Sequence, residues 1–271
     1  MSVMADIVTL ERPREGVALI TMSNPDINNH GSWAGVGQLG EALAEAREQG
    51  ARVSVLASDT PGHWYEHAWL RDLRNTVIGE PTTGTGGGWG TCLDELAKTT
   101  VVTIAAISGD CSGGGAELGW ACDLRIAEEN ARFGQPEVQI ALTTGIGGTS
   151  RLARIIGRTA TAEMVLDGTP MTAQRIYDLG GVNRVVPDGT SIEVALDWAS
   201  RLADRPAKAL ATLKQILIDN DDLGLTEALT NEQRLFGTVV GTEEAIATMG
   251  SIQDRFDAGE SIESVYGSPR P

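Results

Sequence analysis

The sequence is poor in positive charge, and lysine is its scarcest charged residue. Among 271 residues, 21 are lysine or arginine and 37 are aspartate or glutamate, which gives a formal net charge of −16. Lysine occurs only at positions 98, 208 and 214. A field of this sign repels a phosphate backbone, so we expect no nucleic acid as the principal partner. An anionic small ligand would have to be held by arginine, by backbone N–H groups or by helix N-termini.

Cysteine and long apolar runs are also scarce. The chain has three cysteines, Cys92, Cys111 and Cys122, without CxxC spacing, and the odd number argues against a disulfide framework. We interpret them as small buried side chains of a reducing compartment and expect a cytoplasmic protein. No apolar stretch approaches the ~20 residues that a transmembrane helix needs, and the N-terminal segment lacks the apolar core of a signal peptide. We therefore expect no membrane partner.

The apolar residues that are present predict an α/β fold. They make up 41% of the chain, which is enough to bury a full core. Short runs with strand character lie at residues 17–22, 53–57, 101–107 and 124–127. The pattern is almost wholly helical from residue 149 onward, so we expect an α/β core over residues 1–200 and a helical C-terminal subdomain over residues 201–271. The glycine-rich stretch 82–90 is expected to be a surface loop.

Three consecutive glycines follow one of the predicted buried strands. The strand ends at Ser108, and Gly113, Gly114 and Gly115 allow a sharp turn and a close approach of the backbone to a ligand. A helix starts at this turn, so its first N–H groups are free and carry the positive end of the helix dipole. Such donors suit an oxyanion.

Two glutamates accompany the glycine turn. Glu117 lies three residues beyond Gly114 on the same helical face, and Glu137 follows Pro136, which fixes the local backbone direction. Two carboxylates beside a backbone anion site can act as a general acid–base pair. On spacing alone a structural interpretation is equally open, with the glycines forming a packing turn and both glutamates solvated.

Residues 104–157 resemble the sequence signature of the crotonase (enoyl-CoA hydratase/isomerase) superfamily. The shared features are the IAAI strand, the GGGAEL helix start, the CDLRIA strand, the FGQPE loop and the GIGGTSRLARIIG segment, in family order and spacing. A weaker match follows in MVLDGTPMTAQRIYDLGGVNRVVP, and the resemblance extends over residues 5–256. It implies a core of spiralling ββα turns, C-terminal helices that cover the active site, and a homotrimer or dimer of trimers. It also implies an acyl-CoA thioester as substrate, with no cofactor besides the coenzyme A of that substrate.

The resemblance assigns individual site residues. Gly114 matches the glycine of the family's oxyanion hole, and Ala68, in the loop WYEHAWL, matches the second N–H donor. Glu117 and Glu137 fall on the two glutamates with which hydratases hold and activate water, whereas isomerases of the family usually keep one acid near these places. No metal is expected. The further substrate-binding residues are expected to be His67, Trp69, Gly113, Gly115 and Gly145.

Several positions depart from the family pattern. His67 replaces a glycine and Trp69 an aspartate on either side of the donor alanine, so we expect a narrow acyl pocket that favours short or flat acyl groups. Asp26 stands where the family has a basic residue that contacts the adenosine phosphates of coenzyme A. Thr144 replaces a proline ahead of the GxGG run, and Arg255 is the lone basic residue of its stretch.

These features favour a hydro-lyase that adds water across the 2,3-double bond of an enoyl-CoA. Two other hypotheses stay open. The same anion hole could serve C–C hydrolysis of a β-diketone or isomerisation of an enoyl-CoA, which His67, Trp69 and the missing CoA-binding base favour. A catalytically idle subunit kept for assembly is the other hypothesis, and the presence of both glutamates and all three glycines argues against it.

Two motifs imitate other sites. His63-x-x-Glu66-His67 matches a zinc-protease pattern, but zinc would need both histidines on one helical face, and proline and glycine precede this run. We interpret His67 as a packed or site-lining histidine. The GxGxxG run at residues 35–40 imitates a dinucleotide fingerprint, whose glycines directly follow a strand, whereas eleven residues separate Ser23 from Gly35. We interpret these glycines as helix-packing residues. The carboxylate pair would also suit a glycosidase, but nothing else supports a sugar site.

Overall fold

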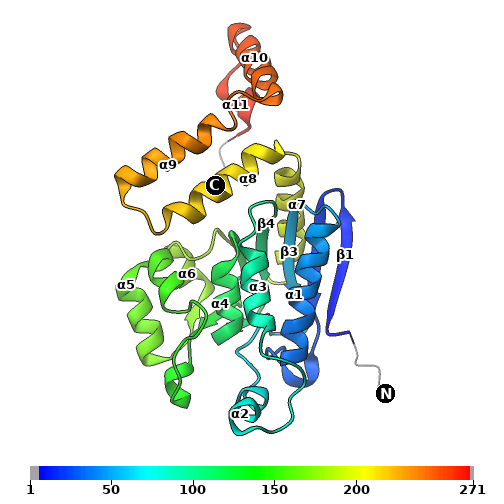
Figure 1. The fold of residues 1–271 in the computed structure, drawn as a ribbon, viewed down its shortest axis with the longest axis vertical. Coiled ribbons are helices and arrows are strands. Elements are labelled where there is room, and N and C mark those ends of the chain that lie inside the picture. Colours follow the sequence, from blue (N-terminus) through cyan, green and yellow to red (C-terminus); the bar gives the residue numbers. More distant parts are fainter. Residues whose placement is uncertain (1–5, 269–271) are drawn as a thin grey trace. The chain divides into compact units, whose positions relative to one another are not determined.

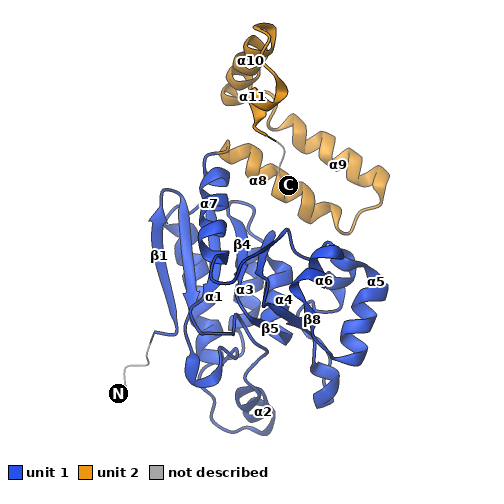
Figure 2. Ribbon diagram, turned by 180° about the vertical axis from the view of Figure 1, so that it is seen from behind, with its two compact units in different colours: residues 1–204 blue, residues 205–271 orange. Residues whose placement is uncertain are grey.

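The computed structural model describes residues 6–268, and its chain forms two compact units that divide after Asp204 (Figure 2). The first unit holds both sheets and every predicted site residue, and the second consists of helices. Strands alternate with helices along the first unit (Figure 1). The predicted α/β class with a helical C-terminal part is therefore confirmed.

The large sheet of the first unit has six strands in the order β1-β2-β3-β4-β6-β9. They are β1 (Val8–Arg14), β2 (Val17–Met22), β3 (Val53–Ser58), β4 (Val102–Ile107), β6 (Leu124–Glu128) and β9 (Arg184–Val186). Neighbouring strands are parallel except β1 and β2, which pair antiparallel. Strands β3 and β4 are buried along their whole length, which explains why their sequences are mostly apolar and do not alternate with exposed polar residues.

The chain also forms a second sheet of three short strands, and it passes repeatedly from the large sheet to this small one. Its strands, in the order β5-β7-β8, are β5 (Asp110–Ser112), β7 (Arg132–Gly134) and β8 (Met171–Thr172). The chain runs from β4 in the large sheet to β5 in the small one and then into helix α4 (Gly113–Ala121). β6 and β7 repeat this crossing, before the 3-10 helix η2 (Glu137–Ile140) and helix α5 (Ser150–Asp167). The predicted glycine turn thus lies where the second strand of one ββα unit passes into its helix.

Helices cover both faces of the large sheet (Figures 1 and 2). α1 (Trp33–Glu48) and α3 (Gly88–Leu96) pack against each other on one face, and α7 (Ser191–Ala203) lies across β2, β3, β4 and β6 on the other. A Cβ on Gly40 would lie 2.9 Å from the Thr91 side chain of α3, so glycine permits this close approach. This supports the helix-packing interpretation for Gly40, whereas a Cβ on Gly37 would meet nothing within 4 Å. The remaining elements of this unit are η1 (Pro25–Ile27), α2 (Leu70–Ile78) and α6 (Ala173–Asp178).

The stretch 82–90 is not a surface loop throughout, so that prediction is wrong at its C-terminal end. Helix α3 begins at Gly88, and Trp89 is only 8% exposed. Its indole edge fills the space that a Cβ on Gly31 or on Gly114 would need, at 2.5 Å and 2.7 Å. A single large aromatic among glycines therefore contributes a core contact that the composition of the stretch hides.

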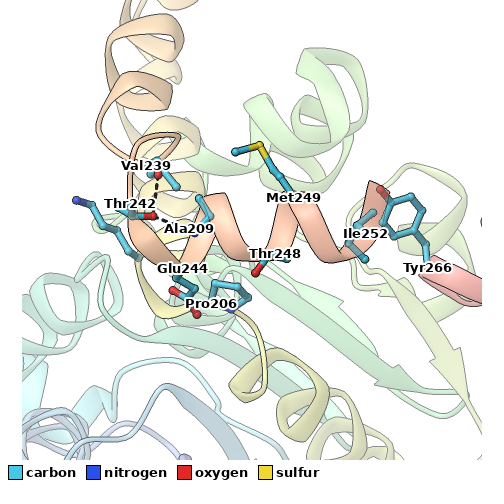
Figure 3. A pocket seen from close by; sticks show the side chains of 11 residues that line it. Pro206, Ala209, Val239, Thr242, Glu244, Thr248, Met249, Ile252 and Tyr266 are labelled. Atoms are coloured by element: carbon cyan, nitrogen blue, oxygen red, sulfur yellow. Dashed lines mark hydrogen bonds between the residues drawn. The ribbon is translucent and has the colours of Figure 1, made fainter. Parts of the chain in front are cut away.

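The second unit contains α8 (Ala207–Asn220), α9 (Leu225–Gly237), α10 (Glu243–Asp257) and α11 (Ile262–Tyr266). Residues of this unit line a mostly apolar cavity of about 290 Å³, with Met249, Ile252 and Tyr266 on its wall (Figure 3). The ring of Phe256 lies 5.7 Å from that of Tyr266 and joins α10 to α11. Within residues 6–268, no helix is both long and apolar enough to span a membrane.

Candidate active site

A buried asparagine holds the start of the loop that follows β3. Asn29 is fully buried, and its side-chain amide donates to the hydroxyl of Ser58 (2.7 Å) and to the carbonyl of Trp64 (3.0 Å). The backbone N–H of Asn24 donates to the oxygen of the same amide (2.6 Å). Because these groups are all satisfied inside the protein, the loop has a defined starting position.

Gly31 fixes the end of the same loop and leaves one donor free. Its N–H donates to the carbonyl of His67 (2.9 Å), and its carbonyl accepts from the N–H of Trp69 (3.0 Å). The carbonyl of Ala68 accepts from Nδ1 of His67 (2.8 Å). Among the residues that the structure describes, none accepts from the N–H of Ala68. This donor therefore lies between two pinned neighbours and is available to an oxyanion.

The N-terminus of α4 packs directly against this loop, and its glycines are required by contact. A Cβ on Gly115 would lie 2.1 Å from the carbonyl oxygen of Tyr65. The N–H of Gly115 donates to the carbonyl of Glu66 (3.1 Å). Gly113 has a φ of +49°, and a Cβ there would lie 2.5 Å from Cβ of His67. The structure therefore places the predicted glycines and His67 in one site.

Gly114 provides the second free donor. It is the second residue of α4, and its N–H has no acceptor in the described part of the chain. The indole of Trp89 lies against its Cα, where a Cβ would be 2.7 Å from the ring. The predicted pair of donors, Ala68 and Gly114, is thus carried by two segments that hydrogen-bond to each other.

Glu117 is a buried carboxylate anchored by the GxGG segment. It is 3% exposed, and its Oε1 accepts from the N–H groups of Ile146 (2.9 Å) and Gly148 (2.6 Å). An ionised carboxylate has only acceptor sites, so two N–H donors suit it. Gly145, a predicted substrate-binding residue, directly precedes Ile146, and a Cβ there would meet nothing within 4 Å. No described contact therefore requires glycine at position 145, and its role in substrate binding stays a prediction.

Glu137 is the second carboxylate of the site and lies in a different environment. It is partly buried at the start of η2, and its Oε1 lies 3.3 Å from the position of a Cβ on Gly113. Partial burial raises the pKa of Glu137, and the charge of Glu117 raises it further, against the lowering effect of its own backbone hydrogen bond. The two glutamates therefore interact electrostatically, and both burial and this interaction favour the protonated form of Glu137.

A fully buried glutamine that the sequence did not single out orients Glu137. With its amide nitrogen toward the carboxylate, Gln135 donates to Oε1 (2.9 Å) and Oε2 (3.3 Å) of Glu137. Its amide oxygen then accepts from Nε1 of Trp120 (3.3 Å). The opposite amide orientation would set acceptor against acceptor and donor against donor, so the indole N–H fixes the orientation.

His67 and Trp69 line a groove of about 410 Å³ beside the Ala68 donor. Burial lowers the pKa of His67, and His30 lowers it further, against a hydrogen bond to Ala68; the two imidazole rings lie 4.4 Å apart. Arg71 also lines this groove, with its guanidinium 5.5 Å from the ring centre of Trp69. The groove therefore contains a cation as well as Asp26, and the motif that carries Asp26 does not predict this cation because Arg71 lies outside it.

The H-x-x-E-H pattern is divided between two surroundings. Nδ1 of His63 hydrogen-bonds to Glu66 (2.9 Å), whereas His67 faces Ala68 and the groove. Ligand atoms of His63, Glu66 and Asp110 lie within 4.8 Å of one another, so these three could approach a cation. Asp110 already forms a two-bond ion pair with Arg132 (2.7 and 2.9 Å). The structure thus does not join His63 and His67 in one ligand set.

The fold and the site together define a class. Strand pairs that wind between two sheets, with a glycine-started helix presenting a free N–H beside two glutamates, form the crotonase fold. The sequence model described as enoyl-CoA hydratase/isomerase matches residues 12–254. The chain therefore belongs to the enoyl-CoA hydratase/isomerase family, as the sequence resemblance predicts.

Individual relatives agree with this family. The chain is 40% identical over 141 residues to a 2,3-dehydroadipyl-CoA hydratase of Escherichia coli, which covers 52% of this chain and 55% of that protein. It is 27% identical over 251 residues to a probable enoyl-CoA hydratase of Mycobacterium bovis, covering 92% and 96%. The crystal structure of an enoyl-CoA hydratase subunit from Geobacillus kaustophilus superposes with a TM-score of 0.82 at 28% identity, covering 92% and 95% of the two chains.

Proposed function

We propose that the protein is an enoyl-CoA hydratase that adds water across the 2,3-double bond of an acyl-CoA thioester. The observation that carries this proposal is a pair of glutamates in unequal environments beside two unpaired backbone donors. Glu117 is held by two N–H groups, whereas burial raises the pKa of Glu137. Carboxyl groups whose environments separate their proton affinities can divide into a base and an acid.

The proposed reaction uses each group once. The thioester oxygen accepts hydrogen bonds from the N–H groups of Ala68 and Gly114. Glu117 takes a proton from water through Oε2, since Oε1 is occupied by backbone donors, and the hydroxide bonds to C3. The π electrons of the C2–C3 bond move toward the thioester, whose oxygen becomes an enolate held by the two donors. Glu137 then gives its proton to C2, which completes the 3-hydroxyacyl-CoA.

Coenzyme A enters this scheme as part of the substrate, and we propose no separate cofactor. The chain is short of lysine, so an anionic ligand depends on arginine and backbone donors. Arg71 supplies a guanidinium in the groove beside Ala68, where Asp26 also lies. We place the CoA portion of the substrate in this groove, with Arg71 offsetting the acid at position 26.

A substrate panel tests the proposed function. It contains crotonyl-CoA, 2,3-dehydroadipyl-CoA, a 3-enoyl-CoA and a free β-diketone, and the readout is loss of the enoyl thioester absorbance together with product mass. The proposal predicts addition of one water to the 2-enoyl thioesters. Turnover of the 3-enoyl-CoA alone would establish an isomerase, and cleavage of the diketone a C–C hydrolase. Tight binding without turnover of any compound would indicate an idle subunit.

We also propose that the protein assembles as a homotrimer or a dimer of trimers. The helical unit has many large apolar side chains that are more than half exposed in the single chain. They include Leu213, Leu217, Leu225, Phe236, Ile246, Ile262 and Tyr266. Exposed apolar surface of this extent is typical of a face that pairs with another chain. Size-exclusion chromatography with light scattering would test this, and a monomer at micromolar concentration would contradict it.

A further inference from the structure

The serine that precedes α4 does not use its hydroxyl to cap the helix. Ser112 is the N-cap of α4, with extended backbone angles (φ −140°, ψ 157°), yet its side chain makes no capping hydrogen bond. A serine at this position usually accepts from the N–H of the second or third helical residue. Here those residues are Gly114 and Gly115, so a normal cap would compete with the thioester oxygen for the Gly114 donor.

Glu66 removes the Ser112 hydroxyl from this competition. The hydroxyl donates to Oε2 of Glu66, and the other oxygen of the same carboxylate pairs with Nδ1 of His63 (2.9 Å). Glu66 is only 7% exposed, so both partners hold it in place without competition from bulk water. The backbone carbonyl of Glu66 meanwhile accepts from Gly115 (3.1 Å). Glu66 thereby binds the Ser112 hydroxyl through its side chain. Through its carbonyl it binds the N–H of Gly115, one of the two donors that this hydroxyl could otherwise cap.

The two members of this pair occupy equivalent places in the two segments of the oxyanion hole. Glu66 lies two residues before Ala68, and Ser112 lies two residues before Gly114. The N–H of Ser112 also donates to the carbonyl of Tyr65 (3.2 Å), which keeps the segments in register. In the first turn of α4, the N–H of Gly115 is thus taken by the carbonyl of Glu66, whereas no described residue accepts from the N–H of Gly114.

We propose that Glu66 is a positioning residue that keeps the Gly114 donor open by holding the Ser112 hydroxyl. This inference rests on the proposed function, because an occupied donor matters only if a thioester oxygen must bind there. When Glu66 is lost, the Ser112 oxygen rotates to accept from Gly114 and closes half of the oxyanion hole. The activity is then restored by removing the hydroxyl itself.

Four variants test the proposal: Glu66→Ala, Glu66→Gln, Ser112→Ala and the double variant. Losing one oxyanion donor costs about 10²–10³ in kcat, so we expect Glu66→Ala to lower kcat about 100-fold. Glu66→Gln keeps an acceptor for the hydroxyl and should remain within about 3-fold of wild type, as should Ser112→Ala. In the double variant kcat should recover at least about 10-fold over Glu66→Ala. KM should change little throughout, because Arg71 and the groove are untouched.

A second readout separates this proposal from the proposed function. Acetoacetyl-CoA forms an enolate with its own near-ultraviolet absorbance, and an intact oxyanion hole favours that form on binding. The enolate signal should fall in Glu66→Ala and return in the double variant. If the wild type fails to hydrate any enoyl-CoA but shows this pattern, the proposed function is wrong and the role of Glu66 stands.

Matched variants guard against a trivial loss of folding. Glu66→Met fills the same volume without an acceptor and should reproduce Glu66→Ala, including its rescue by Ser112→Ala. Ser54 is buried with an unpartnered hydroxyl in β3, so Ser54→Ala removes a similar group elsewhere and should not rescue. The proposal is overturned if the double variant is as slow as Glu66→Ala or Glu66→Met, or if Ser54→Ala rescues equally.

Discussion

A methyl group added at Gly114 should disable the oxyanion hole while leaving the fold in place. The Cβ of an alanine would lie 2.7 Å from Cη2 and 3.1 Å from Cζ3 of Trp89. Carbon atoms pack at about 3.5–4.0 Å, so either the indole or the start of α4 must move by roughly 1 Å. A displacement of this size at a catalytic donor costs about 100-fold in rate. Overpacking costs about 1–3 kcal/mol of stability, which the better helix propensity of alanine offsets by about 1 kcal/mol.

The assay compares kcat for crotonyl-CoA with the thermal midpoint of unfolding. Gly114→Ala should lower kcat about 100-fold and the midpoint by only a few degrees. Gly37→Ala is the control, because a Cβ there meets nothing within 4 Å and the helical position favours alanine. Trp89→Phe removes the ring atoms that cause the clash, so the double variant Gly114→Ala/Trp89→Phe should regain most of the lost rate. Unchanged kcat in Gly114→Ala, or no recovery in the double variant, would refute the reasoning.

Three further predictions concern the groove and the second carboxylate. Because the pKa of Glu137 is raised in the folded state, its contribution to stability is fully present below about pH 4 and is lost as pH rises through the raised value. The thermal unfolding midpoint of Glu137→Gln should therefore exceed that of wild type by an amount that grows from pH 4 to pH 7. An equal difference at all pH values would contradict this. Arg71→Ala should raise KM for CoA thioesters about 10-fold with little change in kcat, since one charge-assisted hydrogen bond contributes about 1.5–3 kcal/mol. Calorimetry with free coenzyme A measures the same loss of affinity. An unchanged affinity would show that coenzyme A does not bind in this groove. Trp69→Ala should raise kcat/KM for C8–C10 substrates relative to C4, because each methylene newly buried in the widened pocket contributes about 0.8 kcal/mol of binding free energy. An unchanged chain-length profile would show that the indole does not border the acyl group.

The parts of the fold that the sequence predicts are those with strong local signals. Strands β2, β3 and β4 are mostly apolar runs because they lie inside a covered sheet, and α1 shows helical spacing on its buried face. The sequence does not predict β1, because VTLERPR is largely polar, as an edge strand of the sheet allows. β5, β7 and β8 have two or three residues each, and so short a strand leaves no periodicity.

The site divides in the same way. The glycine turn and both glutamates lie in contiguous motifs, so the sequence identifies them. The sequence does not identify the residues that support the glycine turn and the glutamates, because that support depends on contacts between distant segments. Strands β6 and β7 separate Trp120 from Gln135 in the sequence, and Glu66 meets Ser112 across 46 positions. Each of these residues alone has an ordinary structural interpretation, and only the folded chain shows what it orients.

The central claim is that Glu117 and Glu137 together hydrate an enoyl thioester held by two backbone donors. The most direct test is the rate of crotonyl-CoA hydration by wild type, Glu117→Gln and Glu137→Gln under one set of conditions. Both substitutions keep the size and the hydrogen-bonding oxygen of the side chain, so folding and CoA affinity should persist while kcat falls by about 10²–10⁴ in each. Wild-type activity in both variants would contradict the account.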